Sequence, residues 1–243
     1  MSSRLLLLLC VATLFFISCS DETTVYNEPK SQVEIEANID ELAKSLNFDN
    51  AGVIDFYEED KSSGKFAKKE EDEAGDYPLT LLAQVKAPVY NGADLAATHV
   101  AVDENGYAYV TYNTQHDAHE GAIDIISVKN PHNPQLTARL HYLNADVNSI
   151  TVSDGFMYVV GSVDAEKSVT ATENSFVAKI KTANGRFDFA HGITYGFQKG
   201  YVGTDVLTYN NKVIATSGKE GTLTVYEKDN MEILQQVSFQ DLR

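Results

Sequence analysis

The sequence has little cysteine, with two in 243 residues, and it has no tryptophan and only five prolines. Cys10 lies within an apolar run that is typical of a removable leader, so Cys19 would remain as the single thiol. One thiol excludes an intramolecular disulfide. A packed core, and not a disulfide framework, must therefore hold the fold together.

Basic residues are also scarce, because 19 Lys and Arg stand against 35 Asp and Glu and give a formal net charge of −16. A chain without a basic stripe is a poor match for phosphate groups, so no nucleic-acid partner is expected. The acidic excess is concentrated in residues 20–78, which contain seventeen acidic and six basic side chains. Such a segment is typical of a solvated spacer.

Catalytic motifs are missing as well. The sequence contains no glycine-rich phosphate loop, no nucleophile elbow, no C-x-x-C and no H-E-x-x-H. No enzyme and no cofactor is therefore predicted.

The N-terminus has the features of a targeting segment. Arg4 gives a positive start, and Leu5 to Phe16 is almost wholly apolar but too short to span a bilayer as a helix. Small Ser18 precedes Cys19, and "FISC" resembles the lipobox of bacterial lipoproteins, with departures at the positions of Phe16 and Ile17. Residues 1–18 are thus predicted to be a lipoprotein signal peptide. A plain secretory peptide is the alternative.

The lipobox resemblance implies that Cys19 is lipidated. Each buried methylene contributes about 0.8 kcal/mol, so several acyl chains hold a protein on a membrane where one does not. The following Ser-Asp-Glu, residues 20–22, resembles the acidic export signal of Bacteroidota surface lipoproteins. The resemblance implies an outer-membrane protein that is anchored by its N-terminal lipid and faces outward.

Residues 19–51 are expected to form an acidic tether that contains a short helix. Ser31 and Glu34 have capping-box spacing. Ile35, Ile39, Leu42 and Leu46 follow at helical intervals. These features predict an amphipathic helix from about Gln32 to Leu46.

An internal repeat dominates the rest of the chain. Alternating apolar and polar residues follow Gly52, Gly121 and Gly221, and a weaker copy begins at Ser175. Alternation of period two predicts strands. Between the copies lie three expected hairpins, with turns at 103–106, 153–155 and 210–211 that are rich in Asn, Asp and Gly.

Four short antiparallel strands per unit, at intervals of about 50 residues, predict an all-β fold of β-propeller blades. The Asn130–Pro134 turn, the Ile123-Asp124-Ile125 strand and the Tyr107–Val110 strand resemble the LVIVD-repeat β-propellers. The resemblance covers about residues 79–163 and fades afterwards.

The strand pattern gives three blades and two unpaired strands, which do not make a ring. We therefore expect an incomplete propeller, either a fragment of a longer protein or a domain completed by self-association. The expected divisions of 52–243 are an orphan outer strand at 52–60, an acidic loop at 61–78, blades at 79–134, 135–186 and 187–231, and the start of a further blade at 232–243.

Two sets of residues are candidates for chemistry. His99, His116, His119 and Glu120 are metal-ligand types that lie in or near loops on one face of the first blade, and solvated loop histidines are the alternative. Asp94, Asp146 and Asp205 precede comparable strands and would ring the axis to bind a cation or a polar ligand. The alternative for these is local bonding to turn backbone.

The sequence favours a binding or scaffold protein with a protein partner, such as an outer-membrane complex. The second class is a propeller enzyme, a hydrolase or lyase with its site on the axis.

Overall fold

A computed structural model describes residues 33–48, 81–90, 92–114 and 119–239. The regular structure of the described residues is almost all β-strand, in antiparallel sheets of which none closes on itself. The predicted signal peptide, Cys19, and the strand and loop expected at 52–78 lie outside the described residues.

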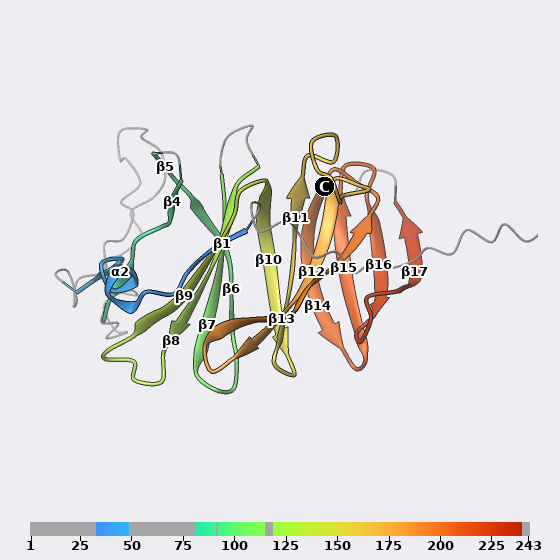
Figure 1. Ribbon diagram of the computed structural model, residues 1–243. Coiled ribbons are helices and arrows are strands. Elements are labelled where there is room, and N and C mark those ends of the chain that lie inside the picture. The colour runs from blue at the N-terminus through green and yellow to red at the C-terminus, as the bar shows by residue number, and fades with distance from the viewer. Residues whose placement is uncertain (1–32, 49–80, 91, 115–118, 240–243) are drawn as a thin grey trace, which may run out of the picture.

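Three larger sheets follow one another along the chain and lie side by side (Figure 1). The first sheet has the order β1-β9-β8-β7-β6, with β1 at Val33–Glu36, β6 at Ala96–Val102, β7 at Tyr107–Asn113, β8 at Gly121–Ser127 and β9 at Gln135–Tyr142. The second sheet contains β10 at Ala145–Ser153, β11 at Phe156–Val163, β12 at Ser175–Ala183 and β13 at Arg186–Gln198. The third sheet contains β14 at Val202–Tyr209, β15 at Lys212–Gly218, β16 at Thr222–Glu227 and β17 at Ile233–Ser238.

Short elements precede β6 and cover the first sheet on its side away from the second. They are α2 at Ile39–Ala43, β2 at Leu46–Asn47, β3 at Gln84–Val85, β4 at Val89–Tyr90 and β5 at Ala93–Asp94. Leu42 and Leu95 are buried against this side of the first sheet. We call this segment, residues 38–48 and 81–95 as far as they are described, the N-terminal cover.

The structure confirms the three predicted hairpins. Gly106, Gly155 and Asn210 have positive φ, as tight turns require. These turns join β6 to β7, β10 to β11 and β14 to β15. Local turn chemistry was therefore sufficient to place the hairpins.

The predicted grouping of strands is wrong by one strand. The strand from Gln135 was expected to open the second unit, yet β9 pairs with β8 in the first sheet. The backbone bond from Asn133 to Asn130, at 3.0 Å, reverses the chain so that β9 returns along β8. In the same way β17 pairs with β16 and completes the third sheet, instead of starting a further one.

The predicted helix over Gln32–Leu46 is largely wrong. Its first part is β1, which pairs with β9 as a fifth strand. The helix begins only after Asn38, whose side chain accepts a hydrogen bond from the Asp40 amide at 3.0 Å. Ile35 is 50% exposed, so the apolar stripe of the sequence does not become a buried helix face. Pairing with a free sheet edge outweighs the local helical pattern here.

Each sheet repeats one irregularity in its first strand. One extra residue is inserted at Thr98 in β6, at Asn148 in β10 and at Thr204 in β14. A β-bulge of this kind bends the strand and turns the following side chains. The three sheets are thus structural repeats with a shared register: His99, Ser149 and Asp205 follow the bulge at equivalent positions.

The core lies mainly between the sheets. Ile123, Ile125 and Leu140 of the first sheet pack against Ile150 and Val159 of the second. Between the second and third sheets, Tyr158, Val160 and Val177 pack against Val206 and Tyr226. Gly203 lets the third sheet approach the second closely, because a Cβ there would lie 2.9 Å from the backbone nitrogen and oxygen of Gly161.

Candidate functional site

Three of the residues predicted as functional, His119, Glu120 and Asp146, come together at one end of the sheets. This loop end contains the connections after β7, β9, β11, β13 and β15. The structure joins one residue from each predicted set: His119 Nδ1 lies 2.8 Å from a carboxylate oxygen of Asp146. The sequence did not predict this pair, because the two residues come from different sheets.

Asp146 is the centre of a polar network at the loop end. Its Oδ1 accepts hydrogen bonds from the Thr114 hydroxyl at 3.3 Å and from the Glu120 amide at 3.3 Å. Its Oδ2 accepts from Ser162 at 3.2 Å. The carboxylate is therefore used to bind the connection after β7 to the second sheet.

The hydrogen bond to Asp146 raises the pKa of His119 above its usual value, and partial burial opposes the shift. A raised pKa stabilises the fold at pH values below the unfolded pKa of about 6.5, and this contribution is lost as the pH rises through the folded pKa.

The pH dependence of His119→Gln tests the link. Near pH 5.5 we expect the free energy of unfolding of wild type to exceed that of His119→Gln by about 1 kcal/mol, or about 2–4 °C in Tm. Near pH 9 we expect a smaller difference. Burial lowers the pKa of His141, which makes stability depend on pH in the opposite direction. Because wild type and His119→Gln both contain His141, the difference in stability between them reports on His119 alone. The exposed His132→Gln is the control, and an equal Tm difference at both pH values would contradict the link.

The other predicted residues have separate partners. His99 Nδ1 accepts a bond from the Ile150 amide at 3.3 Å, and Asp205 accepts from Ser149 at 2.7 Å. Asp94 lies on β5, in a hollow of about 550 Å³ beside Lys86 and Arg139. The three aspartates are therefore not at one level, because Asp205 follows its bulge whereas Asp146 precedes the bulge in β10. His116 lies outside the described residues.

The first strands of the three sheets, β6, β10 and β14, are joined by a repeated link that the sequence did not reveal. The bulge residue Thr98 donates to the Val147 carbonyl at 2.8 Å, and the bulge residue Asn148 donates to the Gly203 carbonyl at 2.9 Å. Val147 and Gly203 both immediately precede the bulge of the next sheet. The same device therefore joins the first sheet to the second and the second to the third.

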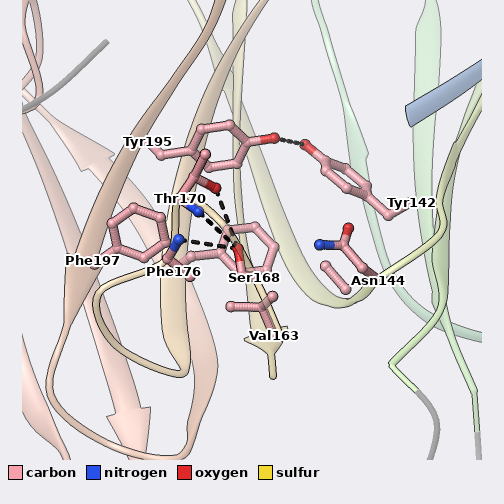
Figure 2. Close-up of a pocket in the computed structure, with 10 residues that line it drawn as sticks. Tyr142, Asn144, Val163, Ser168, Thr170, Phe176, Tyr195 and Phe197 are labelled. Atoms are coloured by element: carbon pink, nitrogen blue, oxygen red, sulfur yellow. Dashed lines mark hydrogen bonds between the residues drawn. The ribbon is translucent and has the colours of Figure 1, made fainter. Parts of the chain in front are cut away.

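A small aromatic pocket also opens near the loop end (Figure 2). Phe176 lies 6.1 Å from Tyr142 and 6.0 Å from Tyr195 between ring centroids, and the two tyrosine hydroxyls are 3.3 Å apart. Ser168 Oγ accepts bonds from the Thr170 and Ala171 amides and shapes the connection at the rim. The cavity volume is about 20 Å³, room for about one water molecule. The rings therefore serve inter-sheet packing, and a drug-sized ligand does not fit.

A buried ion pair lies on the face of the first sheet that is turned away from the second sheet, under the N-terminal cover. Arg139 contacts the carboxylate of Asp124 with Nε at 2.6 Å and an η-nitrogen at 2.7 Å. The Tyr112 hydroxyl donates to the same carboxylate at 3.1 Å, and burial raises the Tyr112 pKa. Asp124 belongs to the strand motif seen in the sequence, but its partner is revealed only by the β8–β9 register.

No family model and no curated protein matches this chain. In the part of the chain that the structure describes, no helix has the length and apolar character needed to cross a bilayer. The same residues contain no group of three or more His, Cys, Asp or Glu side chains arranged to hold a metal ion. The geometry alone must therefore carry a functional conclusion.

Proposed function

We propose that this protein is a binding or scaffold protein built from β-propeller blades and anchored to the outer membrane by a lipid on Cys19. The three sheets are the blades, and β6, β10 and β14 are their innermost strands. The observation that carries the proposal is the repeated bulge link between these strands, since it places two four-stranded sheets and one of four strands plus β1 in succession, and propeller blades are four-stranded sheets arranged around a common axis.

The loop end is the proposed contact surface for a protein partner. Its polar side chains around Asp146 bond to one another, which holds the connections in a fixed shape. Beside them lies an open polar hollow of about 450 Å³, which includes Lys199, Tyr201 and Lys219. Lys219 Nζ lies 4.9 Å from the ring centre of Tyr201, which is 51% exposed. Exposed tyrosines are frequent anchors in protein interfaces.

The anchor is tested by labelling cells with a fatty-acid analogue. We expect the wild-type chain and Cys10→Ala to be labelled and to fractionate with membranes, because Cys10 would be removed with the signal peptide. Cys19→Ala should lose the label and the membrane fraction. A labelled Cys19→Ala chain would contradict the anchor.

The contact surface is tested in the same membranes after extraction in mild detergent. We expect a cross-linked partner that is retained by Tyr209→Ala and lost, by ten-fold or more, with Tyr201→Ala. Both tyrosines are exposed, and they lie at opposite ends of β14. Equal recovery of the partner with the two variants would show that the loop end is not the contact.

A further inference from the structure

The first sheet packs against the second, and the second packs against the third, through structurally equivalent faces. In the first sheet the register row His99, Thr111, Ile123 and Leu140 faces the second sheet. In the second sheet the equivalent row is Ser149, Val160, Val177 and Gly196, and it faces the third. Ile123, Leu140, Val160 and Val177 have no exposed surface. This face is thus buried wherever another sheet follows.

The third sheet has the same face without a described sheet upon it. Its equivalent row is Asp205, Thr216, Leu223 and Val237. The neighbouring row is Leu207, Ile214, Val225 and Gln235. Leu207 is 47% exposed, and Val237 on β17 is 38% exposed. We call these two rows the open face; the third sheet lies at the end of the row of sheets in Figure 1.

The opposite end of the stack is already closed. The N-terminal cover buries Leu42 and Leu95 against the first sheet, and it lies over the buried Asp124–Arg139 pair. A second copy therefore cannot add its first sheet to the open face across the full width of four strands. Among the described residues, the surface that remains to match the open face is the open face itself.

Charge favours contact between two copies at this place. The chain carries −16 overall, but the only ionisable side chain in the two rows is Asp205, which lies at the innermost edge and accepts a bond from Ser149. The adjacent row pairs Lys212 with Glu227 across β15 and β16, so opposite charges lie side by side. Two copies related by a two-fold axis can therefore approach at the open face with little repulsion between like charges. Elsewhere on so acidic a protein, repulsion between like charges would weaken the contact.

We propose that the open face binds the open face of a second copy, which gives a two-fold symmetric dimer with an N-terminal cover at each outer end. Four strands spaced about 4.8 Å apart and about six residues long present a footprint of roughly 20 Å by 20 Å. Phe239, which is 43% exposed and bonds the Gly221 carbonyl just after β17, widens it. Two such footprints bury roughly 800 Å² in total, less than the roughly 1,200 Å² at which stable interfaces begin, so the dimer is weak and dissociates on dilution. The inference does not depend on the lipid anchor or on a partner at the loop end.

Sedimentation velocity of the full chain, extracted in mild detergent and diluted in steps, tests the dimer. We expect a dimer at high concentration that dissociates on dilution. Leu207→Glu should raise the dissociation constant ten-fold or more, because each copy adds a negative charge to the contact. Val102→Glu is the matched control, since Val102 is 62% exposed on β6 at the other end of the stack, and it should leave the constant unchanged.

A second variant guards against a folding defect. Val225→Cys should form a disulfide-linked dimer on mild oxidation, whereas Val102→Cys should not, and circular dichroism should match wild type for both. A chain that is monomeric at every concentration overturns the proposal and leaves the face to another occupant. A dimer that Leu207→Glu does not weaken overturns it as well.

Discussion

Asp124→Asn is expected to lower the free energy of unfolding by about 3–5 kcal/mol. Asp124 has no exposed surface and accepts bonds from Arg139 and Tyr112, so the neutral amide leaves the guanidinium buried without a counter-charge. The N-terminal cover should loosen at the same time, because Arg139 also reaches the Ser45 hydroxyl and the Lys86 carbonyl, each at 3.4 Å. Urea denaturation followed by circular dichroism measures the loss.

Two further variants separate a buried charge from a general effect of substitution. Glu41→Gln breaks the ion pair between Glu41 and Lys44, whose side chains are 52% and 69% exposed, respectively. The substitution should therefore lower the free energy of unfolding by less than about 1 kcal/mol. Asp124→Asn combined with Arg139→Met removes both charges and should be less destabilised than Asp124→Asn alone. If Asp124→Asn stays within about 1 kcal/mol of wild type, the pair is not the anchor of this face.

Local signals in the sequence correctly predicted the three hairpins and the strands that begin near Gly121, Ser175 and Gly221. Alternation of period two and turn residues such as Asp154-Gly155 act over a few positions, so they can be read without the fold. The all-β class follows directly from them. The same local reasoning failed at residues 33–36, where helical spacing competes with a long-range pairing to β9 that the sequence does not display.

The division into sheets could not be obtained from the repeat alone. A repeat fixes the spacing of equivalent strands but not which strand comes first in each unit. The connections on both sides of β9 are short, so only the turn at Asn130–Asn133 decides that β9 pairs with β8. The copies at Gly121 and Gly221 were recognised as equivalent, and both are third strands, not outermost ones.

The contacts of the candidate site also depend on long-range packing that the sequence does not display. His119 and Asp146 were each selected by residue type, but their contact requires the packing of two sheets. Thr98 and Asn148 differ in residue type and carry no shared motif, so no pattern marks them as equivalent bulge residues. Arg139 could be assigned to Asp124 only after the register between β8 and β9 was known.

The link between successive sheets is tested most directly by two matched substitutions, Thr98→Val and Thr204→Val. Each threonine occupies the bulge of its sheet and bonds a threonine of the second strand at 2.8 Å, but among the described residues only Thr98 also donates to a following sheet. We expect Thr98→Val to lower the free energy of unfolding by about 1–3 kcal/mol, because the Val147 carbonyl loses a donor in the interior. Thr204→Val should change it by less than about 0.5 kcal/mol. Equal losses from the two variants would contradict a shared device that joins each sheet to the next.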